Sequence, residues 1–279
     1  MRPESHLSLC VRIVLATIVI TCGAVVVCGQ GGTGKLPQRP PRDPPRRPPE
    51  VGQGPTGPNY TLSIDKAALN RGAIAGEISY HGPAPKRLKV DMSADPFCRQ
   101  LNPKFEIEEP LVRRGKLANV FVYIKDGVTA DGRKLSELSF PNPVREILLD
   151  QSRCRFLPHV LGIMANKTLT IRNSDPITNN IHFMPRNNPD WNQTQIEGAA
   201  PLTHSFGRAD VMVRTRNNQH PWMSAFVGVL NHPFFAVTGE DGAFEIVGVP
   251  PGKYTIAAWH EGPGNGSEVK TIVTVKAAP

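Results

Sequence analysis

The chain has 279 residues, a formal net charge of +8 and 39% hydrophobic residues. The first 58 residues hold seven Lys and Arg and three Asp and Glu, so half of the excess positive charge lies there. The other 221 residues hold 25 Lys and Arg and 21 Asp and Glu. Basic residues beyond residue 58 are not clustered with aromatic residues that would stack on bases, which argues against a nucleic-acid partner.

The first 28 residues predict an export signal. Arg2 and Arg12 give a basic start, and residues 13–27 form an apolar run. That length suits the hydrophobic segment of a signal peptide and is short for a membrane span. We expect an exported protein, periplasmic or at the cell surface, with membrane contact only through this segment. Lipidation at Cys22 or Cys28, or a retained N-terminal anchor, stays open.

Residues 29–58 predict a disordered linker. Segment 36–58 contains nine prolines interleaved with arginines, a composition that favours extended polyproline structure. Residues 29–35 have the glycine and lysine spacing of a phosphate-binding loop. Because Leu36 stands where a Ser or Thr would hold magnesium, we interpret this stretch as a flexible spacer.

The rest of the chain predicts an all-β fold. Short segments rich in Val, Ile, Phe and Thr alternate with Gly, Pro, Asn and Asp turns, as in sandwiches and barrels. No window longer than ten residues has helical periodicity. The predicted strands are 73–80, 117–125, 146–150, 167–172, 210–214, 225–230, 243–247, 253–260 and 269–276.

Two cysteines, Cys98 and Cys154, remain after the export signal. An oxidising compartment permits a disulfide between them, but the geometry that such a bond needs is not readable from sequence. Two separate buried thiols are the alternative. No Cys-x-x-Cys metal motif is present.

Two turns near the C-terminus each precede a predicted strand, Asp241-Gly242 and Pro250-Pro251-Gly252. This unit resembles the carboxypeptidase-regulatory, or transthyretin-like, β-sandwich, and also the small β-domain of rhamnogalacturonan lyases. Residues 73–85 resemble the opening strand and turn of such a module. The resemblance implies a fold and no particular activity.

Two segments in the middle of the chain have the layout of copper-ligand loops. Residues 179–183 read Asn-Asn-Ile-His-Phe, and residues 217–223 read Asn-Asn-Gln-His-Pro-Trp-Met. They resemble cupredoxins of the plastocyanin and amicyanin type. In that family a His-Asn-x-His-Phe segment gives the first ligand, and a Cys-x-x-His-Pro-aromatic-Met loop gives the other three. The resemblance covers residues 146–229 and implies a Greek-key sandwich.

The departures from that family fall on the metal ligands. Asn179 stands where the first histidine would be and Asn217 where the cysteine would be, so only His220 and Met223 match. Blue copper chemistry depends on the copper–thiolate bond. The resemblance therefore implies a scaffold without type 1 copper and without a resident cofactor, in which the two asparagines could hydrogen-bond each other.

A rebuilt metal site is the alternative. His182, His220 and Met223, joined by His159 or His204, would offer imidazole and thioether donors for copper or zinc.

We expect a nested domain order. Residues 70–130 with 231–279 would form the small carboxypeptidase-regulatory-like sandwich, and the cupredoxin-like domain, 140–230, would be inserted between them. The alternative is a tandem order in which 70–230 form one enlarged cupredoxin-like domain.

The sequence predicts a non-catalytic binding or structural protein of the cell envelope. No paired acid and base and no nucleophile motif is recognisable. One alternative is a carbohydrate-binding protein that uses Trp191, placed in a polar loop over 186–194, as a sugar platform. Another is a copper-binding or electron-transfer protein with the rebuilt site. The expected partner is an envelope polysaccharide or protein.

Overall fold

The computed structural model describes residues 9–12, 72–81, 88–104, 106–107, 110–140, 146–262 and 266–276. Apart from residues 9–12, the predicted export signal (1–28) and linker (29–58) lie outside this range. Across the described ranges, no helix is both long and apolar enough to cross a membrane.

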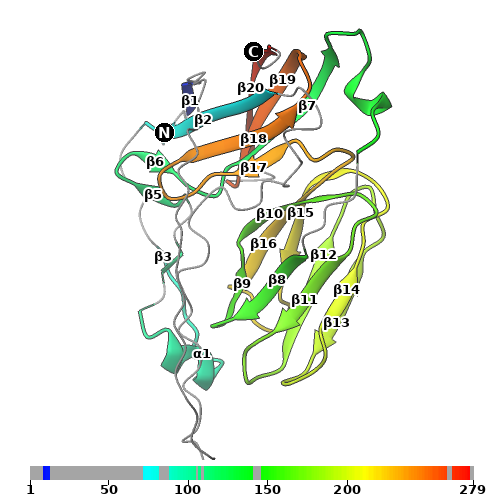
Figure 1. The fold of residues 1–279 in the computed structure, drawn as a ribbon. Helices are drawn as coiled ribbons and strands as arrows, with labels where there is room; N and C mark the ends of the chain where they lie inside the picture. Colours follow the sequence, from blue (N-terminus) through cyan, green and yellow to red (C-terminus); the bar gives the residue numbers. More distant parts are fainter. Residues whose placement is uncertain are drawn as a thin grey trace, which may run out of the picture.

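The prediction of an all-β fold is confirmed: the described strands form two stacked sandwiches (Figure 1). We call the first the terminal sandwich, because its strands lie before and after those of the other. One of its sheets contains β1 (Leu9–Arg12), β2 (Gly72–Tyr80), β5 (Val112–Arg113), β6 (Lys116–Leu117) and β18 (Ala243–Val249). The facing sheet contains β17 (Phe235–Val237), β7 (Phe121–Thr129), β19 (Gly252–His260) and β20 (Ser267–Val275).

The second, which we call the central sandwich, is built from strands between residues 147 and 230. One sheet has the order β10 (Val160–Met164), β16 (Ser224–Leu230), β15 (Asp210–Arg216), β12 (Asn179–Met184) and β13 (Trp191–Gln195). The other has the order β14 (Leu202–His204), β11 (Leu169–Asn173), β8 (Ile147–Ser152) and β9 (Arg155–Leu157). Both sheets are mixed, since β10 pairs with β16 and β8 with β11 in parallel.

The remaining described elements are short. They are β3 (Leu88–Lys89), which pairs with β4 (Glu106–Ile107), the helix α1 (Pro96–Leu101) and the 3-10 turn η2 (Leu135–Glu137). Helix α1 begins at an Asp-Pro pair, in which Asp95 caps the first turn and Pro96 needs no hydrogen-bond acceptor for its nitrogen.

Two sequence predictions need correction. The predicted strand 117–125 is divided into β6 and β7, because Asn119 has a positive φ of 59° and its N–H donates to the carbonyl of Thr238. Of the strands in the two sandwiches, β1, β5, β9, β12, β13, β14 and β17 were not predicted, and neither was β10. All five of its residues are buried, so it lacks the alternation of apolar and polar residues that marks a strand with one exposed face.

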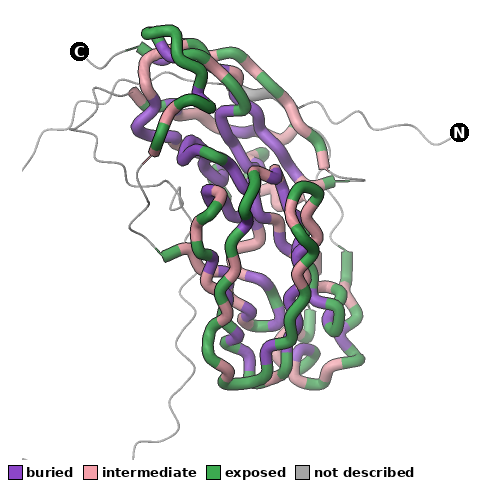
Figure 2. Tube along the Cα trace, turned by 90° about the vertical axis from the view of Figure 1, so that its right-hand side faces the viewer, coloured by how far each residue is buried: buried purple, intermediate pink, exposed green. Residues whose placement is uncertain are grey.

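The two sandwiches share an apolar contact. Phe121 from β7 and Phe235 from β17 stack with ring centroids 5.6 Å apart and pack against β10 and β16 of the central sandwich. A Cβ at Gly228 would lie 2.3 Å from the Phe121 ring, so glycine is required for this close approach. This apolar contact has buried residues from both sandwiches, and Figure 2 shows buried segments in both parts of the chain.

Candidate functional site

The two segments that resemble copper loops meet at one end of the central sandwich. Asn179 is the first residue of β12, and residues 217–223 connect β15 to β16. The Asn217 side chain organises that connection: its Oδ1 accepts the backbone N–H groups of Gln219 (2.8 Å) and His220 (2.9 Å). Such a turn closed by an asparagine side chain brings His220 and Met223 back beside Asn217.

The four side chains at the resembling ligand positions converge, and we call them the amide cluster: Asn179, Asn217, His220 and Met223. The amide nitrogen of Asn217 lies 2.9 Å from Asn179 Oδ1, 3.3 Å from His220 Nδ1 and 3.4 Å from Met223 Sδ. All four residues are buried. An amide NH₂ group, which can only donate hydrogen bonds, therefore lies among the other three side chains.

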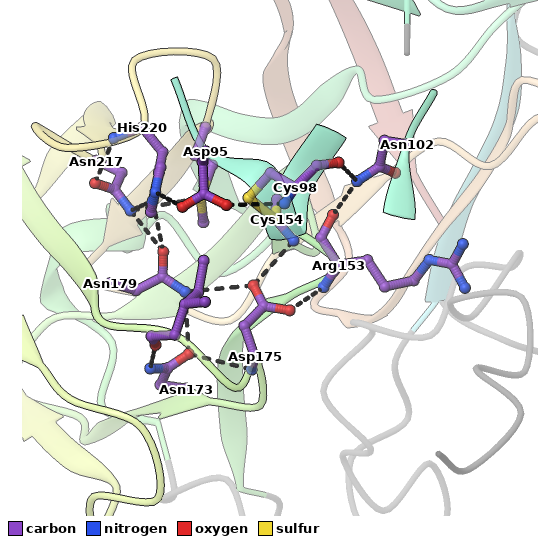
Figure 3. The surroundings of a disulfide bond; sticks show 12 residues. Asp95, Cys98, Asn102, Arg153, Cys154, Asn173, Asp175, Asn179, Asn217 and His220 are labelled. Atoms are coloured by element: carbon purple, nitrogen blue, oxygen red, sulfur yellow. Dashed lines mark hydrogen bonds and ion pairs between the residues drawn. A yellow bond between two sulfur atoms is a disulfide. The ribbon is translucent and has the colours of Figure 1, made fainter. Parts of the chain in front are cut away.

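A second layer of hydrogen bonds fixes Asn179. Its Nδ2 donates to Asn173 Oδ1 (3.0 Å) and to Asp175 Oδ2 (3.3 Å), as Figure 3 shows. Asp175 also accepts the backbone N–H groups of Arg153 (2.6 Å) and Cys154 (2.9 Å). Burial raises the pKa of Asp175 although these N–H groups act against the rise. These contacts orient the Asn179 amide so that its oxygen faces Asn217.

Helix α1 covers the cluster from outside the sandwich. Asp95 caps this helix with Oδ1, which accepts the Cys98 N–H (2.9 Å), while Oδ2 lies 3.0 Å from His220 Nε2 (Figure 3). Burial disfavours the Asp95 carboxylate, but the hydrogen bonds from Cys98 and His220 outweigh it and hold its pKa below the ordinary value.

A disulfide joins α1 to the central sandwich: Cys98 of the helix is bonded to Cys154, in the turn between β8 and β9. Asn102 Nδ2 adds a hydrogen bond to the carbonyl of Arg153 at 3.2 Å. Met92 packs with the two cysteines, and Phe97 and Trp222 lie against them. The segment that carries Asp95 is therefore held both covalently and by packing.

His182 does not join the amide cluster. Its ring lies 2.9 Å from Asp190 Oδ2 through Nε2 and 3.3 Å from Asn218 Oδ1 through Nδ1. Side chains alternate between the two faces of a strand, so His182 points away from the face of β12 that carries Asn179. This corrects the predicted set of His182, His220 and Met223.

The two other candidate histidines also lie elsewhere. His159 contacts Glu261 Oε1 (2.7 Å) and the Ser224 carbonyl (3.0 Å). His204 packs in an aromatic group with Trp191, at a centroid distance of 4.7 Å, and burial lowers its pKa.

The predicted sugar platform also needs correction. Trp191 begins β13 rather than lying in a loop, and it pairs in register with Phe183 of β12. The two rings stack with centroids 5.5 Å apart, and Trp191 lies against the core of the central sandwich. The ring face against Phe183 is thus used for packing.

Sequence reasoning missed Asp95. The signal was present in two forms, an Asp-Pro pair typical of a helix start and a position three residues before Cys98. Asp95, Cys98 and His220 place one potential ligand atom each within 4.8 Å of one another. In the structure the Cys98 sulfur is engaged in the disulfide.

The central sandwich is an all-β structure with two mixed sheets, which is consistent with the cupredoxin-like sandwich expected from the sequence. Solved structures similar to the chain include a Cu(I) form of an amicyanin mutant, at 16% identity and a TM-score of 0.27, covering 39% of this chain and 97% of that one. A purple cupredoxin from Nitrosopumilus maritimus is 19% identical with a TM-score of 0.26, covering 30% of this chain and 99% of that one.

A Cu-containing nitrite reductase from Thermus scotoductus SA-01 is 14% identical, with a TM-score of 0.28. The match covers 33% of this chain, which spans only 24% of that reductase. No family model and no curated protein matches the chain. The resemblance of the terminal sandwich to transthyretin-like modules stays a prediction.

Proposed function

We propose that the protein is an exported, non-catalytic binding or structural protein of the cell envelope, in which the cupredoxin-like sandwich serves as a scaffold and not as a type 1 copper centre. The partner that we expect is a polysaccharide or protein of the envelope. Membrane contact, in this proposal, is limited to the N-terminal segment.

The observation that carries the proposal is the position of the Asn217 amide. Its NH₂ group is within hydrogen-bonding distance of the other three members of the amide cluster. A blue copper site needs a thiolate there, and Asn179 replaces an imidazole as well. The remaining imidazole and thioether lie 3.3 Å and 3.4 Å from this NH₂ group, which cannot bind a metal, so these residues do not fit a type 1 copper ion.

Copper titration tests the proposal. Full-length protein is titrated with Cu(II) while the visible spectrum and the melting temperature are recorded. We expect no intense thiolate-to-copper absorption, because the cysteine beside His220, Cys98, is bonded to Cys154 and offers no thiolate. We also expect no rise in melting temperature that depends on Met223, since the thioether lies beside an amide and not beside a metal position.

Met223→Leu is the matched variant, because this exchange keeps the side-chain volume and removes the sulfur. An intense visible band in the wild-type protein would contradict the proposal. So would a copper-dependent rise in melting temperature that Met223→Leu abolishes, and either result would favour a copper or electron-transfer role.

A further inference from the structure

Three potential metal ligands meet where α1 covers the central sandwich, and a fourth adjoins them. Asp95, Cys98 and His220 bring a carboxylate oxygen, a sulfur and an imidazole nitrogen within 4.8 Å of one another. The Cys154 sulfur is bonded to that of Cys98 at 2.00 Å and adjoins this group, but it does not lie within 4.8 Å of all three of its ligand atoms. Both cysteines are completely buried, and His220 is 7% exposed. The four residues come from three separate parts of the chain.

We infer that the dithiol form of the protein binds one zinc ion through Cys98, Cys154, His220 and Asp95, and that the disulfide closes this site. Two thiolates, one imidazole and one carboxylate are a donor set that tetrahedral Zn²⁺ takes. Ligand atoms around such an ion are about 3.3–3.8 Å apart. His220 Nε2 and Asp95 Oδ2 are 3.0 Å apart, so small movements suffice on this side of the site.

The surroundings orient two of the four ligands. His220 Nδ1 lies 3.0 Å from Asn179 Oδ1, an acceptor that favours the proton on Nδ1 and leaves the Nε2 lone pair for a metal. Asp95 Oδ1 is used by the Cys98 N–H, which leaves Oδ2 for the same metal. Asn179 thus acts as an outer partner that orients the zinc ligand His220.

Helix α1 has contacts that do not depend on the disulfide. Asn102 donates to the Arg153 carbonyl, Met92 is buried beside the cysteines, and Phe97 packs against them. Because these contacts remain after reduction, both thiols stay next to His220 and Asp95.

The conversion needs a dithiol reductant. Thiol–disulfide exchange transfers two electrons and two protons from the reductant to the Cys98–Cys154 bond, giving two thiols and leaving the reductant as its own disulfide. Zn²⁺ then forms bonds to the two sulfurs with release of two thiol protons, and it takes the place of any proton between His220 Nε2 and Asp95 Oδ2.

Cobalt titration tests the site. Full-length protein in which Cys10, Cys22 and Cys28 are replaced by Ser keeps the two relevant cysteines. It is reduced with dithiothreitol, desalted without oxygen and titrated with Co²⁺. We expect one equivalent to give thiolate-to-cobalt charge-transfer and tetrahedral d–d absorption, which one equivalent of Zn²⁺ abolishes. The same protein with its disulfide intact should give neither absorption.

Two variants test the ligands that are not cysteines. His220→Asn and Asp95→Asn should each weaken zinc binding by at least about 10–100-fold, the loss that even an outer-shell partner causes. His182→Asn is the matched control, because His182 forms the same kind of imidazole–carboxylate pair, with Asp190 at 2.9 Å, on the other face of β12. It should leave zinc affinity unchanged.

Two results would overturn the inference. One is a reduced protein that gives no cobalt absorption. The other is equal zinc affinity in the parent, His220→Asn and Asp95→Asn, which would mean that the two thiolates bind metal alone. If reduction unfolded the chain, the parent and both variants would bind zinc with equal affinity. Unfolding would therefore also contradict the inference.

Discussion

The two sandwiches have similar architecture but different interiors. The core of the terminal sandwich consists of aliphatic and aromatic side chains, among them Ile78 and Tyr254. The core of the central sandwich is equally apolar along its length. At the end that α1 covers, however, it continues into buried Asn173, Asp175 and the amide cluster.

This difference shows where the central sandwich departs from simple packing. Buried polar groups cost free energy unless they are hydrogen-bonded, so a cluster of them needs nearly complete pairing. Asn179 and Asn217 achieve that pairing by bonding each other, Asn173, Asp175 and the backbone of their loop. In the terminal sandwich the corresponding stabilisation comes from apolar burial.

The largest effect is expected in the apolar core. Ile78→Ala should lower the free energy of unfolding by about 2–5 kcal/mol, because Ile78 is completely buried and leaves a cavity. Urea unfolding measures this loss. Ile272→Ala, at a position that is 64% exposed on β20, is the control and should change stability by less than about 0.5 kcal/mol. Equal losses in the two variants would contradict the assignment of this core.

A buried histidine should make stability depend on pH. Burial lowers the pKa of His232, between β16 and β17, from 6.5 to about 4. Between these values the unfolded chain binds a proton that the folded chain excludes, so stability is full above pH 6.5 and falls as the pH approaches 4. The loss amounts to up to about 3 kcal/mol. His232→Asn should flatten the slope of urea stability against pH in this window.

Asp175 should change the pH dependence of stability in the direction opposite to that of His232. Because burial raises its pKa, the folded chain holds a proton more tightly than the unfolded chain, and its contribution to stability falls as the pH rises through that range. Asp175→Asn should therefore make the fall in stability toward pH 4 steeper. A pH profile in which both variants change the slope in the same direction would contradict these burial effects.

The amide cluster should be sensitive to loss of a single amide. Asn217→Ala leaves two backbone N–H groups without their partner and removes one of the two groups that face Asn179 Oδ1, and we expect a loss of about 1–3 kcal/mol in urea unfolding. Asn218→Ala removes the neighbouring amide, whose oxygen has a longer contact of 3.3 Å with His182. Asn218→Ala should lower the free energy of unfolding clearly less than Asn217→Ala does. An Asn217→Ala protein as stable as the wild type would contradict a paired cluster.

A smaller effect is expected from one hydroxyl of the terminal sandwich. Tyr254→Phe removes the hydrogen bond to the Pro250 carbonyl (2.9 Å) and keeps the buried ring, so stability should fall by about 1 kcal/mol. A loss above about 3 kcal/mol in thermal or urea unfolding would mean that the hydroxyl matters more than the ring packing.

Local patterns predicted strands such as β2 and β20, because strand alternation and turn residues are short-range features. They missed others with exposed side chains, such as β13, which was expected to be a loop. The position of His182 was also readable: residues 179 and 182 differ by an odd number, so in one strand they point to opposite faces. The contact between Asp95 and His220 was not, since it joins residues 125 positions apart through a helix of six residues. A helix this short has no periodicity to detect.

The most direct test of the central claim is to restore the two ligand types. Asn179→His combined with Asn217→Cys places an imidazole and a thiol beside His220 Nδ1 and Met223 Sδ, in the geometry that the amide cluster defines. With Cu(II), the visible spectrum of the double variant should show an intense thiolate-to-copper band that neither single variant matches. A folded double variant that stays colourless would contradict the assignment of these four positions.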